Sequence, residues 1–101
     1  MSAAQWTTRA LNDRLDIYDY IEPRNPKAAL ALDDVFVQKV RLLLEHPYLG
    51  RPGRTAGTRE LVVHRHYLVV YQASDVEGVR VLRVLYTARR AGTLTSALPG
   101  S

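Results

Sequence analysis

RELVVHRHYLVVYQASDVEGVRVLRVLYT, residues 59–87, is the part of the chain that decides its fold. It contains three runs rich in β-branched and aromatic residues, at 59–63, 67–73 and 79–87, which predict three strands. Asp-Val-Glu-Gly at 75–78 has the composition of a hairpin turn. Because the connections between the runs are short, we expect the strands to pair antiparallel.

A first amphipathic helix is predicted upstream of these strands, over residues 9–21. Its apolar residues recur at helical spacing and form the expected buried face: Leu11, Leu15, Tyr18 and Ile21. Asp13, Asp16 and Asp19 lie on a neighbouring stripe that should face solvent or a partner. Thr7 or Thr8 is the expected N-cap, and the Glu22-Pro23 pair ends the helix, because a residue before proline disfavours helical backbone angles.

A second helix is predicted from Asn25-Pro26 to about Glu45. Asparagine is a good N-cap, and proline is tolerated at the first helical position. Its expected buried stripe consists of Ala29, Leu32, Phe36, Val40 and Leu43. Two such helices joined by a few residues form an antiparallel hairpin.

The predicted fold is a two-layer α+β domain in which this helical hairpin packs on a small antiparallel sheet. A short first strand at 3–7 completes the order strand, helix, helix, three strands. The 101 residues are too few for a second domain, so we expect 1–101 to be one unit. Residues 88–101 are expected to form a loosely ordered tail.

Composition and charge exclude several classes of protein. The chain has no cysteine, so disulfide scaffolds and Cys-ligated metals are excluded, and we expect no cofactor and no metal site. No secretory signal or membrane-spanning stretch is present, which favours a cytoplasmic protein without a membrane partner. The net charge of +4 is unevenly placed. Residues 1–45 carry six basic and seven acidic side chains, whereas 46–101 carry eight arginines and three acidic ones. The basic half favours a polyanion or an acidic protein as partner.

Two further features admit both a functional and a structural interpretation. The segment 46–58 is a Gly- and Pro-rich loop with Arg51 and Arg54, and a solvated connector is favoured over a phosphate-binding loop. His64 and His66, two residues apart at a predicted turn, can hold a metal or supply a base, although solvent-exposed histidines are the commoner case.

Several strings of residues, taken in order, resemble the RelE/ParE superfamily of bacterial type II toxins, often labelled plasmid-stabilisation proteins. The strings are WT (6–7), NPKAA (25–29), GRPG (50–53), GTRELVV (57–63), YLVVY (67–71) and VLRVLYTARR (81–90). The resemblance implies a small α/β toxin that is neutralised by a cognate antitoxin, ParD-like or related. It leaves two activities open: RelE-like members cut mRNA on the ribosome, and ParE-like members inhibit DNA gyrase.

One position separates the two activities. RelE-like nucleases carry an arginine inside a Tyr-Arg-Leu-Val-Tyr string, and the corresponding residue here is Leu68. Leucine cannot stabilise the crowded phosphate of RNA cleavage, which also needs a general base. The favoured hypothesis is therefore a ParE-like gyrase inhibitor with no catalytic residues. The alternatives are a ribosome-dependent endoribonuclease using Arg59, Arg83, Tyr86 and Arg89, and a decayed toxin that persists as an antitoxin partner or autorepressor.

The candidate target-binding residues are Arg59, Arg83, Tyr86, Arg89 and Arg90. If Leu82 and Val84 face the helices, Arg83 faces the opposite side of the sheet, where Arg59 can join it. The alternative role of Arg83 is a cross-sheet pair with Glu60. Tyr86 can contact a target or lie half in the core.

Overall fold

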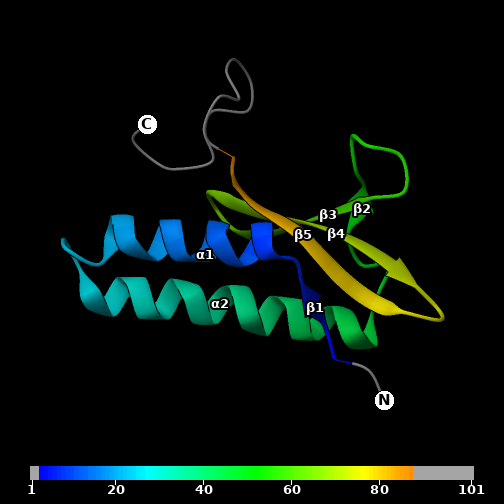
Figure 1. Ribbon diagram of the computed structural model, residues 1–101, viewed down its shortest axis with the longest axis horizontal. Helices are drawn as coiled ribbons and strands as arrows, with labels where there is room; N and C mark the ends of the chain where they lie inside the picture. The colour runs from blue at the N-terminus through cyan, green and yellow to red at the C-terminus, as the bar shows by residue number, and fades with distance from the viewer. Residues whose placement is uncertain (1–2, 88–101) are drawn as a thin grey trace.

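The computed structural model describes residues 3–87 and consists of a helical hairpin packed on a five-stranded sheet (Figure 1). The elements in chain order are β1 (Gln5–Trp6), α1 (Thr8–Ile21), α2 (Pro26–Glu45), β2 (Arg51–Pro52), β3 (Arg59–His64), β4 (Tyr67–Ser74) and β5 (Gly78–Tyr86). The predicted α+β class, the hairpin and the three long strands are confirmed. The predicted tail at 88–101 lies outside the described residues.

The sheet has the strand order β1-β5-β4-β3-β2 and is mixed rather than wholly antiparallel. β2, β3, β4 and β5 pair antiparallel, but β1 pairs parallel with β5. The expectation of an all-antiparallel sheet was therefore wrong at β1. The composition of a two-residue strand carries no information on direction, which the intervening helical hairpin sets. β2, inside the 46–58 loop, was also not predicted.

Both helices begin at the N-caps that the sequence predicted, Thr7 and Asn25. The Thr7 side chain accepts a hydrogen bond from the backbone N–H of Ala10 at 3.1 Å, and the Asn25 side chain accepts one from Ala28 at 3.1 Å. Pro26 is the first residue of α2. No helix within residues 3–87 is long and apolar enough to cross a membrane.

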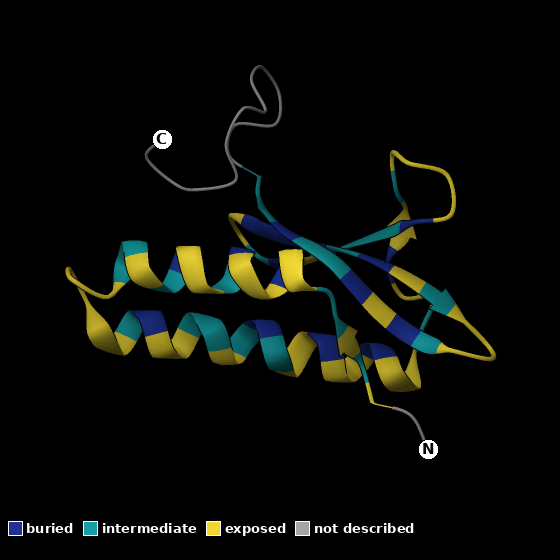
Figure 2. Ribbon diagram, in the orientation of Figure 1, coloured by how far each residue is buried: buried dark blue, intermediate teal, exposed yellow. Residues whose placement is uncertain are grey.

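The core lies between the helical hairpin and one face of the sheet, as the dark blue segments of Figure 2 show. Its largest fully buried side chains are Tyr71, Phe36, Ile17, Leu43, Val40, Val69, Val79, Val81 and Val84. The stripe predicted for α2 is confirmed, with Leu32 packed at its margin. Burial alone must stabilise this small domain, because the chain has no cysteine to cross-link it.

The predicted buried face of α1 was wrong for Leu11 and Leu15, whereas Tyr18 and Ile21 are half-buried and Ile21 packs against the core. Leu11 and Leu15 are 47% and 56% exposed, and the buried residues are instead Ala10, Asp13 and Ile17. Alanine lets the helix approach the sheet closely, and Asp13 finds partners there that compensate its lost hydration. Asp16 and Asp19 are exposed, as predicted.

Candidate functional site

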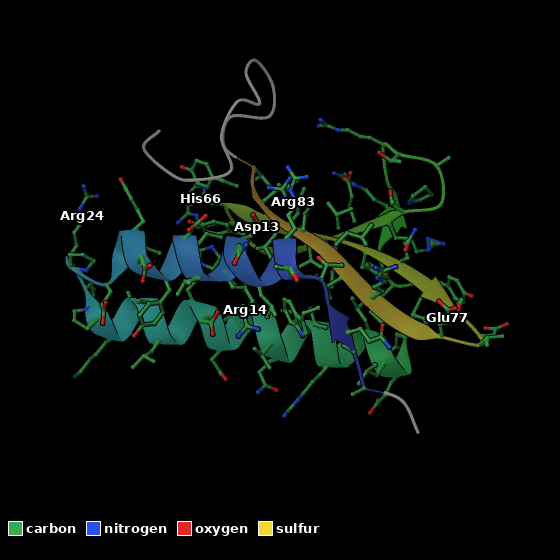
Figure 3. The ribbon with its side chains drawn as sticks, viewed as in Figure 1. Asp13, Arg14, Arg24, His66, Glu77 and Arg83 are labelled. Carbon is green, nitrogen blue, oxygen red and sulfur yellow. The ribbon has the colours of Figure 1, made fainter. Side chains whose placement is uncertain are left out.

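Arg83, the most informative residue of β5, is held by a buried carboxylate from α1. Its Nε and Nη2 donate hydrogen bonds to Asp13 Oδ2 at 2.8 Å and Oδ1 at 3.1 Å, and the two side chains point toward one another in Figure 3. Asp13 is 7% exposed. This bidentate geometry is the strongest form of an arginine–carboxylate pair. The partner of Arg83 is thus Asp13, and the alternative pairing with Glu60 was wrong.

The contact with Asp13 affects the charge state of Arg83. The hydrogen bonds that Arg83 donates to Asp13 raise the pKa of Arg83, and burial, which lowers that pKa, opposes them in part. Arg83 therefore keeps its charge, and that charge is already neutralised inside the protein. Asp13 occupies the Nε–Nη2 edge of the guanidinium and balances its charge, so Arg83 has less to offer a phosphate or a partner than an unpaired arginine.

Asp13 also closes the open edge of the sheet. Its Oδ2 accepts the backbone N–H of Val84 at 2.9 Å, where β1 no longer covers β5. Two residues earlier along β5, the Thr7 hydroxyl donates to the carbonyl oxygen of Leu82 at 3.1 Å. Two side chains thus take the place of a neighbouring strand, which removes unpaired backbone groups from the edge.

A bulge in β5 explains which residues face the core. Val81 lies opposite Tyr71 and Arg83 opposite Val70, so Leu82 has no residue across from it. Val81 and Val84 are both buried, whereas Leu82 is half-buried. Leu82 therefore does not belong to the buried face predicted for it. The register with Val70 alternates Arg83 with the core-facing Val84, as predicted, but its guanidinium reaches Asp13 on α1 and does not lie on an open face.

Arg59 lies on the other side of the sheet from Arg83. It is opposite the buried Tyr71, one residue along β4 from Val70, so side-chain alternation separates the two arginines. The expected common basic face of Arg59 and Arg83 was therefore wrong. The Arg59 Nη1 donates to the Gly50 carbonyl oxygen at 2.9 Å, and its guanidinium carbon is 5.1 Å from the Tyr48 ring centroid. Among residues 3–87, no carboxylate forms an ion pair with Arg59.

Tyr86 lies in an aromatic cluster at the end of the sheet where β4 begins. Its ring centroid is 5.4 Å from that of Tyr67 and 5.9 Å from that of His66, and Phe36 meets Tyr67 edge-on at 5.5 Å. Burial, and secondarily Tyr86, raises the pKa of Tyr67 to about 12, so that phenol stays protonated at neutral pH. Tyr86 itself is half-buried, which combines the core and surface roles that were considered for it.

The two histidines beside this cluster differ in environment. His66 is exposed, but His64 is half-buried, and its Nδ1 has no hydrogen-bond partner within the described residues. Their ring centroids are 6.3 Å apart. Within residues 3–87 no three His, Asp or Glu side chains gather as metal ligands. Arg89 and Arg90 lie outside the described residues.

The contacts by which Asp13, Tyr71 and Tyr48 position the candidate site were not predicted from the sequence. The Tyr71 hydroxyl donates to the Pro47 carbonyl oxygen at 2.8 Å and accepts the Gly50 N–H at 2.9 Å, and so holds the start of the 46–58 loop. A Cβ at Gly50 would lie 2.7 Å from the Glu60 carbonyl oxygen and 2.8 Å from that hydroxyl. The string Pro-Tyr-Leu-Gly at 47–50 was the available signal for this close packing.

The chain matches a known protein family over most of its length. The model of the family "ParE toxin of type II toxin-antitoxin system, parDE" matches residues 4–91. The chain is 41% identical over 80 residues to Y4kP of Sinorhizobium fredii, which is described as a toxin, covering 77% of this chain and 83% of that one. It is 37% identical over 89 residues to "Toxin RelE2" of Caulobacter vibrioides, covering 88% and 99%.

Solved structures agree on the fold. A "Chromosomal ParDE TA system from P. aeruginosa" superposes with a TM-score of 0.74 and 26% identity, covering 86% of this chain and 97% of that one. The E. coli DinJ–YafQ complex gives a TM-score of 0.57 at 15% identity, covering 91% and 100%. The fold and sequence together define a type II toxin of the RelE/ParE superfamily. Within it, the chain belongs to the ParE toxin family.

Proposed function

We propose that this toxin inhibits DNA gyrase by binding it, breaks no bond itself, and is neutralised in the cytoplasm by a ParD-like antitoxin. The observation that carries the proposal is Leu68. It is 5% exposed on β4, between Val62 of β3 and Leu85 of β5. An apolar environment replaces the cation that an RNA-cleaving relative is expected to hold at this place.

The neighbouring groups support the same proposal. Arg83 is neutralised by Asp13, and Tyr67 is protonated at neutral pH because its pKa is about 12. Cleavage by a ribose hydroxyl needs both a base and free cations on the phosphate. A binding toxin needs neither, since affinity requires only a complementary surface.

One observation favours the second candidate, a ribosome-dependent endoribonuclease. The exposed His66 and the half-buried Tyr86 lie side by side, 5.9 Å between ring centroids, and an imidazole can act as a general base. Under this candidate Arg59, Arg83, Tyr86 and Arg89 are the catalytic set. Their placement weakens it, because Arg59 and Arg83 lie on opposite faces of the sheet.

The test is a gyrase supercoiling assay with the purified toxin. We expect loss of supercoiling that is restored by the antitoxin encoded beside it. The double variant R89Q/R90Q should inhibit less than wild type, because it removes two of the candidate target-binding charges. R65Q is the matched control, since Arg65 is exposed and belongs to no candidate site.

A parallel reaction in a translating extract, with mRNA ends mapped, tests the second candidate. Normal supercoiling at excess toxin contradicts the gyrase proposal. Codon-positioned mRNA cuts in the same preparation would replace it with the nuclease.

A further inference from the structure

We propose that a cleft beside Arg59 binds a carboxylate side chain of the antitoxin, an inference that rests on the proposed function. The Arg59 cleft is a hollow of about 280 Å³. It is lined by Tyr48, Pro52, Gly57, Thr58, Arg59 and Ala73. It lies at the opposite end of the sheet from the Tyr86 cluster, since Arg59 pairs with Tyr71 and Tyr86 pairs with Tyr67.

Arg59 is arranged to receive an anion. Its Nη1 is anchored on the Gly50 carbonyl oxygen, and its guanidinium stacks on the Tyr48 ring. Both contacts restrict the side chain before any partner arrives, which lowers the entropic cost of binding. Its remaining N–H groups have no carboxylate partner within residues 3–87. The contrast is Arg83, whose Nε–Nη2 edge is already bound by a carboxylate, that of Asp13.

The rim of the cleft has the composition of a protein-binding surface. Tyr48 is 55% exposed, so an aromatic side chain stands free beside the arginine, and Pro52 and Ala73 add apolar surface to the lining. Tyrosine and arginine are the residues most enriched at the energetic centres of protein interfaces. Apolar contacts around an ion pair also exclude water and strengthen it.

The surrounding charges favour an isolated carboxylate over a nucleic-acid backbone. The Tyr48 hydroxyl donates to Asp75 Oδ1 at 3.5 Å. Glu77, at the hairpin tip in Figure 3, and Arg80 both line the adjoining hollow that shares Gly57 and Ala73 with the cleft. A chain of phosphates would meet both carboxylates, whereas one Asp or Glu flanked by apolar residues avoids them. The basic half of this chain steers such an acidic segment toward the cleft.

The experiment measures binding of the full-length toxin variants to the purified cognate antitoxin by titration calorimetry at two salt concentrations. We expect R59Q to weaken binding about tenfold or more, as truncation of a central interface arginine does. Y48A should weaken it as well, because it removes the ring on which the guanidinium rests, and its exposed position protects the fold. R65Q is the matched control: it removes the same charge from the exposed turn after β3 and should stay within about twofold of wild type.

Different contrary results would contradict different parts of the proposal. If wild type binds and neither R59Q nor Y48A differs from it by more than about twofold, the cleft proposal is overturned. If R65Q weakens binding as much as R59Q, only net charge matters, which also overturns it. If R59Q keeps its antitoxin affinity but no longer inhibits gyrase, the cleft is reassigned to gyrase. If R59Q keeps its antitoxin affinity but no longer binds a labelled single-stranded oligonucleotide, the cleft is reassigned to nucleic acid. Absence of any binding by wild type contradicts the antitoxin part of the proposed function instead.

Discussion

Arg83 and Arg59 stand on neighbouring parts of one sheet, yet the protein uses them differently. Arg83 reaches Asp13 on α1 and becomes part of the edge of the sheet. Arg59 bonds only a carbonyl oxygen and stacks on an exposed ring. The same residue type is thus structural where a carboxylate from a helix reaches its guanidinium, and available where only a loop contacts it. An arginine in a strand cannot be assigned a role from its position alone.

The largest expected effect is at Asp13. D13A leaves the Arg83 charge and the Val84 N–H without their partner, at a cost of about 3 kcal/mol, the lower end of the range for buried pairs, because the Arg83 side chain is 28% exposed. The free energy of unfolding from urea titration measures it. D16A, on the exposed side of the same helix, should change it by less than about 0.5 kcal/mol. If D13A lowers the free energy of unfolding by less than about 1 kcal/mol, the Asp13–Arg83 pair does not have the structural role proposed for it.

A smaller effect is expected at Tyr71, which holds the loop next to Arg59. Y71F keeps the buried ring but leaves the Pro47 carbonyl oxygen and the Gly50 N–H unpaired, at a cost of about 1–2 kcal/mol. Thermal unfolding reports the loss. Amide hydrogen exchange at Gly50 should accelerate in this variant, and unchanged exchange there would mean that another group holds the loop.

The smallest effect on stability is expected at Arg59 itself. R59Q removes one hydrogen bond to Gly50 and a cation–π contact near the surface, which together are worth about 1 kcal/mol or less. Its melting temperature should stay close to that of wild type. A loss as large as that of D13A would make Arg59 a second structural arginine and end the contrast between the two regions.

Much of the fold was predictable because local signals agreed with the tertiary structure. Asn25-Pro26 begins α2, the β-branched runs form β3 to β5, and the α2 stripe is buried. On α1 the apolar stripe pointed to the wrong face, because Leu11 and Leu15 are exposed while Asp13 is buried. Periodicity counts a carboxylate as polar and cannot anticipate a buried partner seventy residues away.

The candidate site was less predictable than the fold. The face of Arg83 was inferred correctly from alternation along β5, but its partner and the face of Arg59 were not. The bulge at Leu82 and the register of β3 with β4 decide on which face each arginine lies. Neither feature can be recognised from the amino-acid composition of the strands. The roles of Arg59, Arg83, Tyr86, Arg89 and Arg90 as target-binding residues stay predictions.

The sequence by itself determined both helices, the three long strands, their order and the family, because caps, turn residues and β-branched runs act over a few neighbouring positions. It also determined that the positive charge lies in the second half of the chain. Only the tertiary structure decided which of those charges is free. A charge is neutralised by what lies within a few ångströms of it, and for Arg83 that is a carboxylate from the first helix.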